Sequence, residues 1–351
     1  MQKFLNRIIC GDCIEVLGKV REPFADLIFA DPPFNIGYKY DKYYDKVKSK
    51  NYIAWTKDWM SVCKKVLKPH GSFYIAIGDE YAANVKIIAD DLGLIMRNWI
   101  IWHYTFGQQM KKKFARAHTH ILYFVKHKDH FTFNADVTRV ISDRQRRYKD
   151  KRAYPEGKMP DDVWDEYPRV CGTFEERTDF PCQMPESLLA RIIRVSSNDN
   201  DWILDPFVGS GTTTIAAAKL GRNFTGIDIS EEYVRKSQER IQSCRNLAIE
   251  GEGKLKWNEQ LEAELKWLYH ENKVPTEQLK DDPILLTLFA EKFNKRVGSK
   301  KNPFQPKQII KHLIQMRKSA KLGPLRGHPI PRKSKKPNSE KTLWQAGEKL
   351  K

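Results

Sequence analysis

The sequence predicts an α/β protein with a mostly parallel sheet and a smaller helical module behind it. Short apolar runs of strand length alternate with segments of helical spacing over residues 1–104, and the pattern returns over 185–243. At 351 residues, the chain is long enough for one large domain and a second, smaller unit.

Four segments carry the pattern in the first part of the chain. Residues 7–10 and 27–30 read as strands, 52–66 has apolar side chains at helical spacing, and 71–79 is a strand with turn signals at both ends. From about 105 to 180 the sequence is polar and aromatic without a sustained period, so we interpret it as an inserted target-recognition region rather than sheet core.

The alternation resumes after this region. It predicts helix 185–196, strand 202–204, helix 212–220, strand 224–227 and helix 231–243. We therefore place the main domain at 1–247.

The rest of the chain predicts a helical connector over 248–280 and a small helical module over 281–323. In the module, Leu285, Leu286, Phe289 and Phe293 share a helical spacing, and a second helix starts near Pro306. The Pro- and Lys-rich residues 324–351 are predicted to be a basic, disordered tail.

Positive charge is concentrated in two regions. The net charge is +18, and residues 291–351 hold 18 Lys and Arg against 3 Asp and Glu, while residues 105–158 hold 14 against 5. Two separate basic regions favour a polyanionic partner, most simply nucleic acid. The apolar runs are too short to cross a bilayer and no leading signal peptide is evident, so we expect no membrane association and a soluble, cytoplasmic protein.

The six cysteines are scattered and are expected to be reduced thiols. Cys10 and Cys13 form a CxxC, but no second pair at metal-ligand spacing accompanies it, so we expect no metal site.

The first motif, Asp31-Pro32-Pro33-Phe34, directly follows strand 27–30. Two adjacent prolines remove two N–H donors and fix two φ angles. The result is a stiff corner that carries a carboxylate, outward-pointing carbonyls and an aromatic ring.

The second motif is a strand, a glycine loop, a helix and another strand that ends in an acid. Gly209 and Gly211 allow a sharp bend before the positive N-terminus of a helix, and Asp228 ends the next strand, where nucleoside-binding α/β folds place a ribose acceptor. A dinucleotide site is the competing interpretation. Thr214 stands where GxGxxG needs glycine or alanine, and Asp205 places an acid before the loop, which suits a ligand with an amino group such as S-adenosylmethionine.

Together the motifs resemble the beta group of DNA amino-methyltransferases, in which the catalytic motif comes first and the cofactor loop late. The resemblance covers about residues 5–245 and includes "IICGDCIEVL", "ARAHTHILYFVK" and "DFPCQMPESLLARII". The last commonly reads QKPE, and Met184 stands at the lysine here. The resemblance implies an S-adenosylmethionine-dependent methyltransferase fold with circularly permuted motif order.

The resemblance also implies roles for individual residues. Asp31 and the Pro32 carbonyl would accept the two hydrogens of the target amino group, within a catalytic corner that includes Pro33, and Phe34 would stack on a base flipped from the duplex. The implied residues for S-adenosyl-L-methionine are Asp12, Asp205, Phe207, Gly209, Gly211, Thr212, Asp228 and Ile229. The candidate DNA-binding residues are Lys111, Lys112, Lys113, Arg116, Arg144, Arg146, Arg147, Arg317 and Lys318.

The expected function is site-specific methylation of adenine N6 in double-stranded DNA, as in restriction-modification systems, because the cytosine N4 enzymes more often carry serine at the position of Asp31. Cytosine N4 methylation, RNA methylation and a catalytically inactive nucleic-acid-binding module remain alternatives. Cytosine C5 methylation needs a cysteine nucleophile, typically in a Pro-Cys context. It is disfavoured here, because Pro181-Cys182 lies in the segment that resembles the cofactor-side helix. The recognition sequence, a cognate restriction endonuclease and a homodimer stay open.

Overall fold

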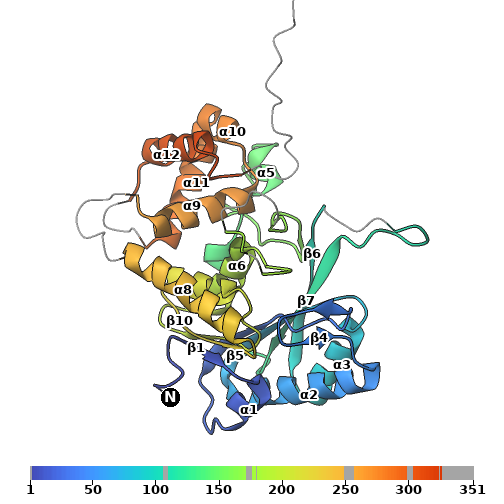
Figure 1. Ribbon diagram of the computed structural model, residues 1–351. Coiled ribbons are helices and arrows are strands. Elements are labelled where there is room, and N and C mark those ends of the chain that lie inside the picture. Colours follow the sequence, from blue (N-terminus) through green and yellow to red (C-terminus); the bar gives the residue numbers. More distant parts are fainter. Residues whose placement is uncertain are drawn as a thin grey trace, which may run out of the picture.

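The computed structural model describes residues 2–105, 110–170, 176–178, 180–248, 257–298, 303–323 and 325. Within these residues, an eight-stranded sheet in the spatial order β1-β10-β9-β2-β5-β7-β6-β8 forms the centre (Figure 1). Its strands are β1 (Arg7–Cys10), β2 (Ala25–Ala30), β5 (Leu67–Ile77), β6 (Ile95–His103), β7 (His118–Val125), β8 (Val163–Trp164), β9 (Trp202–Asp205) and β10 (Asn223–Asp228). The sheet is parallel except where β7 pairs with β5 and β6, so the predicted α/β class is confirmed.

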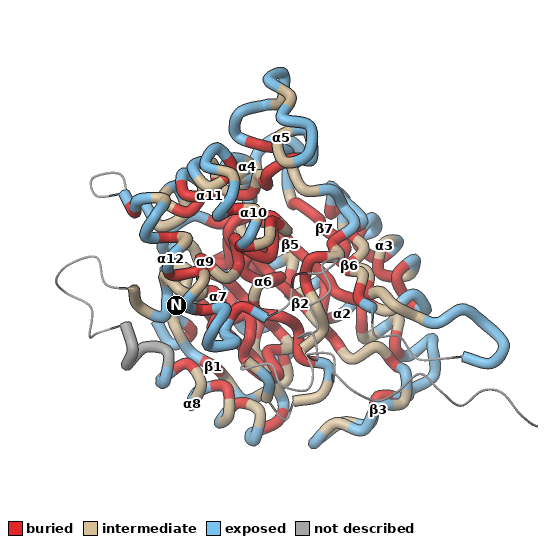
Figure 2. Tube along the Cα trace, turned by 90° about the horizontal axis from the view of Figure 1, so that it is seen from above, coloured by how far each residue is buried: buried red, intermediate tan, exposed pale blue. Residues whose placement is uncertain are grey.

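Helices cover both faces of the sheet. One face holds α1 (Cys13–Gly18), α2 (Ser49–Val66) and α3 (Ala82–Asp91), and the other holds α6 (Glu186–Ser196), α7 (Thr212–Lys219) and α8 (Glu231–Ala248). Within β2, Ile28 and Ala30 join the first apolar core, whereas Leu27 and Phe29 join the second, because successive side chains of a strand point to opposite faces. Buried residues therefore run through the middle of the molecule (Figure 2).

The interpretation of 105–180 as lying outside the sheet core was wrong for β7, which is a central strand. Residues 121–125 are all buried. A strand buried on both faces is apolar without alternation, and the polar residues before it hid this short run. The remainder of the region holds α4 (Ala135–Thr138), α5 (Asp143–Arg146) and β8, and its recognition role stays a prediction.

Four helices form the C-terminal helical unit, α9 (Glu259–Asn272), α10 (Thr276–Asp281), α11 (Pro283–Arg296) and α12 (Pro306–Lys318). The helices predicted around Leu285 and from Pro306 are confirmed as α11 and α12. Their apolar faces share one core with those of α9 and α10, although the division into connector and module stays a prediction. Residues 249–256 and the predicted tail 324–351, except 325, lie outside the described residues. No helix of the described part is long and apolar enough to cross a membrane.

A buried ionic network joins this unit to the main domain. Arg194 of α6 lies 2.7 Å from Glu264 of α9, and Arg296 of α11 contacts Glu264 at 3.3 Å and Glu271 at 2.5 Å. Burial alone would raise the pKa of Glu271, but the surrounding arginines outweigh it and lower this pKa to about 2. Removing one partner of such a network leaves an unpaired charge in the interior, which is strongly destabilising.

Candidate active site

Four aspartates lie at the carboxyl ends of four neighbouring parallel strands. Asp12 follows β1, Asp228 ends β10, Asp205 ends β9 and Asp31 follows β2. Because the carboxyl ends of parallel strands share one edge of a sheet, these residues meet, and all four line one cavity of about 740 Å³.

The corner after β2 is held by hydrogen bonds from outside the motif. The residues Asp31, Pro32, Pro33 and Phe34 all line the cavity. The Tyr52 hydroxyl of α2 donates to the Pro33 carbonyl at 2.6 Å. The carboxylate of Asp45, which is fully buried, accepts the N–H groups of Asn35 at 2.5 Å and Ile36 at 3.2 Å. The two prolines and these three bonds leave the corner little freedom.

The acids of the cavity are poor at holding negative charge on their own. Burial, with a further contribution from Asp205, raises the pKa of Asp31 to about 8. Burial likewise raises the pKa of Asp205 to about 7 and raises the pKa of Asp228. A positively charged ligand would offset the cost of ionising these carboxyl groups, so the cavity favours a cation.

The two glycines of the glycine loop have different roles, because Gly209 lines the cavity whereas Gly211 does not. Gly209 has a φ of +45°, its N–H donates to the Asp228 carboxylate at 3.0 Å, and an added Cβ would lie 2.5 Å from the Phe180 ring. Gly211, with a φ of +81°, is the residue before α7, and an added Cβ would lie 2.9 Å from Ser237 Cβ of α8. Gly211 therefore permits helix packing and is not among the residues that line the cavity.

The other predicted cofactor residues also reach the cavity, whose lining includes Phe207, Thr212 and Ile229. Asp12 has a second task, because its carboxylate accepts the N–H of Ile14 at 2.6 Å and so caps α1. In the part of the chain that the structure describes, no three His, Cys, Asp or Glu side chains gather as metal ligands do.

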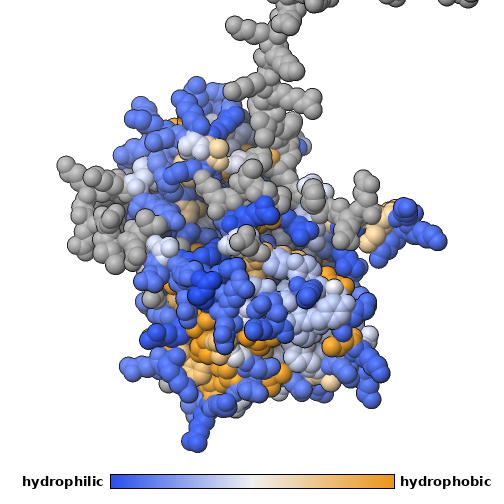
Figure 3. All heavy atoms as spheres, viewed as in Figure 1, coloured by the Kyte–Doolittle hydropathy of each residue, from blue (hydrophilic) through white to orange (hydrophobic). Residues whose placement is uncertain are grey.

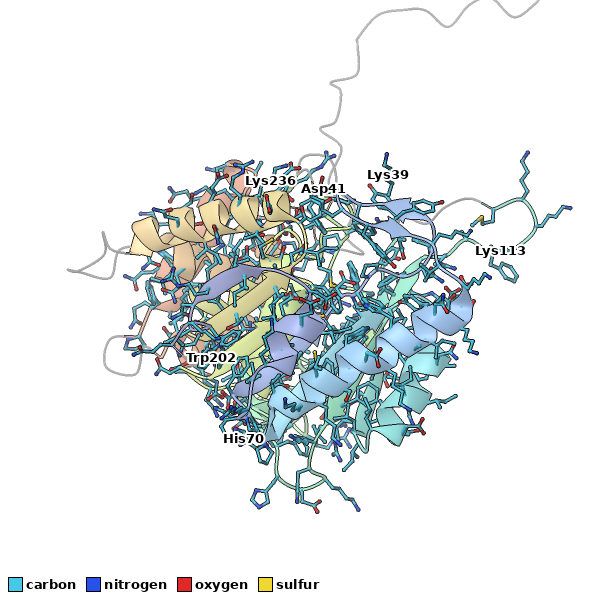
Figure 4. The ribbon with its side chains drawn as sticks, turned by 60° about the horizontal axis from the view of Figure 1, so that its bottom comes forward. Lys39, Asp41, His70, Lys113, Trp202 and Lys236 are labelled. Carbon is cyan, nitrogen blue, oxygen red and sulfur yellow. The ribbon has the colours of Figure 1, made fainter. Side chains whose placement is uncertain are left out.

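A hairpin that sequence reasoning missed borders the same cavity. It is formed by β3 (Tyr38–Lys39) and β4 (Tyr44–Asp45), and its turn meets α8, where the Ser230 hydroxyl donates to the Asp41 carboxylate at 2.7 Å. Figure 4 shows Asp41 between Lys39 of the hairpin and Lys236 of α8. The signal was the tyrosine-rich stretch 38–44. The aromatic lining includes Tyr38, Tyr40, Tyr43, Trp55, Tyr104 and Phe180.

Four of the predicted DNA-binding residues precede β7 in the chain, and one of them, Arg116, reaches the cavity. Lys111, Lys112 and Lys113 are exposed on residues 110–117, the described part of the loop that leads into β7, which projects from the body of the molecule (Figure 1). Arg116 lies nearer the sheet, lines the cavity and pairs with Asp79 at 2.7 Å.

The other predicted DNA-binding residues lie elsewhere, and most have acidic partners. The partners are Asp150 for Arg144, Asp143 for Arg146 and Arg147, and Glu277 for Arg317, whereas Lys318 is exposed. Arg146 also donates to the Lys273 carbonyl at 2.8 Å, so α5 is tied to the C-terminal helical unit. Of the predicted DNA-binding residues, Arg116 alone lines the cavity.

Comparisons with known proteins agree with this geometry. Residues 25–239 match the model of the N6_N4_Mtase family, described as DNA methylase. The chain is 39% identical to the type II methyltransferase M.HpaI of Haemophilus parainfluenzae over 239 residues, which cover 68% of this chain and 74% of that protein. It is 37% identical to the DNA adenine methyltransferase YhdJ of Escherichia coli K12 over 257 residues, 71% and 87% of the two chains.

Among solved structures, the PvuII DNA methyltransferase, which is cytosine-N4-specific, has a TM-score of 0.53 at 20% identity. The match covers 70% of this chain and 93% of that one, and it shows a common fold.

Proposed function

Because the chain belongs to the N6 and N4 DNA methylase family, we propose that it methylates the N6 amino group of adenine at a specific site in duplex DNA. The protein is a DNA methyltransferase of the restriction-modification type, with the S-adenosylmethionine-dependent fold and the catalytic corner ahead of the glycine loop. Its cofactor is S-adenosyl-L-methionine. A DNA substrate supports a location inside the cell.

The cavity fits this cofactor in charge and shape. S-adenosylmethionine carries an ammonium and a sulfonium, and the cavity contains three carboxyl groups whose pKa values burial raises, Asp31, Asp205 and Asp228. The glycine loop lets the backbone come close at Gly209. We assign Asp228 and Ile229 to the ribose side, and Asp12 to the adenine side.

The methyl acceptor would be activated by the corner residues. When bound, the cofactor supplies a methyl group that is activated by its positive sulfur. An adenine amino nitrogen is a poor nucleophile, because its lone pair is delocalised into the ring. The Asp31 carboxylate and the Pro32 carbonyl would accept its two hydrogens and localise that pair. The Tyr52 hydroxyl donates a hydrogen bond to the Pro33 carbonyl and so fixes the corner.

The single observation that carries the proposal is the convergence of Asp31 with the cofactor acids in one cavity. Such a cavity admits a base only after it leaves the duplex, so base flipping belongs to the proposal, with Phe34 stacking on the flipped ring. Adenine is favoured over cytosine by Asp31 itself and by the 37% identity to a protein described as a DNA adenine methyltransferase.

Sequencing that detects methylated bases tests the proposal directly. The protein is expressed in bacteria that lack their own adenine methyltransferases, and the Asp31→Ala variant is the matched control. We expect N6-methyladenine at one sequence context, absent with the variant. Detection of N4-methylcytosine instead would support cytosine N4 methylation. Methylated RNA with unmodified DNA would support an RNA methyltransferase. No methylation with intact cofactor binding would support a catalytically inactive nucleic-acid-binding module.

A further inference from the structure

The loop between β6 and β7 carries an aromatic side chain with no protein surface to cover it. Phe114 is 99% exposed, the most exposed of the large hydrophobic residues that the structure describes. It directly follows Lys111, Lys112 and Lys113, all exposed. Figure 4 shows Lys113 on the extended part of this loop, and in Figure 3 the loop carries hydrophilic surface with a small apolar area beside it.

The loop returns from Phe114 directly to the proposed active site. Arg116 and His118 line the cavity, and Arg116 is anchored by its ion pair with Asp79. Since an extended chain spans at most about 3.6 Å per residue, Phe114 lies within roughly 15 Å of the cavity wall at His118. That distance is comparable to the radius of a DNA duplex, so the ring can reach the stack from which a base enters the cavity.

Charge determines which partner this ring fits. Three adjacent lysines next to an exposed ring suit a polyanion with apolar faces, and the stacked bases of DNA between two phosphate backbones have both features. An apolar protein partner would leave the three ammonium groups without counter-charges.

Resting on the proposed function, we propose that Phe114 inserts into the base stack of duplex DNA beside the target and fills the space that the flipped base leaves. The ring stacks on the neighbouring bases and loses its exposed apolar surface. Lys111, Lys112 and Lys113 bind the adjacent phosphates and hold the loop against the groove. Phe114 thus acts on the duplex, whereas Phe34 contacts the flipped base inside the cavity.

This inference is tested by single-turnover methyl transfer on short duplexes that contain the methylation site identified by the sequencing experiment above. The Phe114→Ala variant should slow transfer to a fully paired duplex by roughly tenfold or more, because base–aromatic stacking is lost. Phe114→Leu should recover part of the rate, because an aliphatic side chain can also wedge between bases. Ile284→Ala, which truncates another exposed apolar residue (69% exposed) on α11, is the matched control and should behave like the wild type.

A duplex with a mismatched base opposite the target separates insertion from a structural effect. The mismatch already weakens pairing, so the Phe114→Ala defect should largely disappear on it. An equal loss on paired and mismatched duplexes, or no loss on either, would overturn the inference. A wild-type protein that methylates no DNA would instead contradict the proposed function.

Salt dependence distinguishes the ring from the lysines. Lys112→Ala should flatten the slope of log K against log salt by about 0.9, whereas Phe114→Ala should weaken binding without changing this slope. A flatter slope for Phe114→Ala would contradict insertion.

Discussion

The hydroxyl group of Ser230 donates a hydrogen bond to the Asp41 carboxylate at 2.7 Å, while the N–H of Ser230 donates to the Asp228 carboxylate at 2.9 Å. The residue directly before α8 therefore connects the hairpin to the acid assigned to the cofactor. Asp45 of the same hairpin accepts the backbone N–H groups that follow the catalytic corner. The hairpin therefore contacts both the catalytic corner and the residue beside Asp228.

Breaking this connection should loosen the hairpin over the cofactor. Asp41→Ala is expected to speed cofactor dissociation by about three- to tenfold, less than the full effect of a hydrogen bond to a charged group, because this bond holds the hairpin and not the cofactor itself. Ser230→Ala should produce the same change, and the double variant should add little more, because the two residues share one bond. Stopped-flow displacement of the cofactor measures the rates; fully additive effects would show that the bond does not act as a unit.

Asp31→Ala should reduce methyl transfer by at least about a hundredfold, because the amino group loses its charged acceptor. Cofactor affinity should fall by a smaller factor, since Asp31 is assigned to the target amino group and only its charge acts on the cofactor. Single-turnover transfer and calorimetry on the same sample separate the two quantities. A near-wild-type rate would remove Asp31 from the chemistry.

Asp228→Ala should weaken cofactor binding by about 1.5–3 kcal/mol, the range for hydrogen bonds to a charged group. The carboxylate also accepts the N–H of Gly209, so the glycine loop loses an anchor in the same variant. Calorimetry gives the affinity, and Asp228→Asn serves as the control that keeps an acceptor. Unchanged affinity in the alanine variant would place the ribose elsewhere.

Gly209→Ala and Gly221→Ala form a matched pair. Both glycines have positive φ, +45° and +73°, so each variant carries backbone strain of about 1–2 kcal/mol. Only at Gly209 does the added Cβ meet a neighbour, the Phe180 ring at 2.5 Å, whereas nothing lies within 4 Å at Gly221. Cofactor affinity should therefore fall in Gly209→Ala alone, while thermal unfolding shows lower stability in both. Equal affinities would exclude close packing at the loop as the requirement.

The acids of the cavity make folding and binding depend on pH. In the folded protein the pKa of Asp31 is raised to about 8 and that of Asp205 to about 7, against values near 4 in an unfolded chain. Their contribution to the free energy of unfolding is therefore fully present below about pH 4 and is lost progressively as the pH rises from there to 7 for Asp205 and to 8 for Asp31. The melting temperature of the cofactor-free protein should fall over this window, and less so in the Asp31→Asn, Asp205→Asn double variant.

Cofactor binding should release protons near pH 7, because a cation favours the ionised forms of these two acids. Calorimetry in buffers of different ionisation enthalpy measures the release. Binding without proton exchange in the wild type would contradict the assigned pKa values.

The elements that sequence reasoning predicted are those in which local pattern and tertiary environment agree. The strands ending at Ala30, Asp205 and Asp228 are apolar runs followed by an acid, and the order of the parallel strands then brings these acids together. β7 was missed because its five-residue apolar run follows a polar stretch without a sustained period, which was interpreted as part of the inserted recognition region.

Long-range partners could not be read from the sequence at all. Arg317 on α12 is a predicted DNA-binding residue, but Glu277, forty positions earlier, pairs with it. The hairpin after the corner was hidden for a related reason: Asp45 and Asp41 look like ordinary loop acids until the fold supplies their backbone and hydroxyl donors. Gly211 shows the same limit, since its neighbour Ser237 belongs to another helix.

The ionic network between α6 and the C-terminal helical unit restricts how this protein can be recombined with its relatives. Consider a chimera in which only residues 257–323 come from a relative. Arg194 would then lie opposite the relative's residues at the positions of Glu264, Glu271 and Arg296, and would lose its own partners. A mismatched charge there is enclosed by protein, so solvent cannot correct it. Helix α6 and the C-terminal helical unit must therefore be exchanged together, even though α6 and α11 lie about a hundred residues apart in the chain.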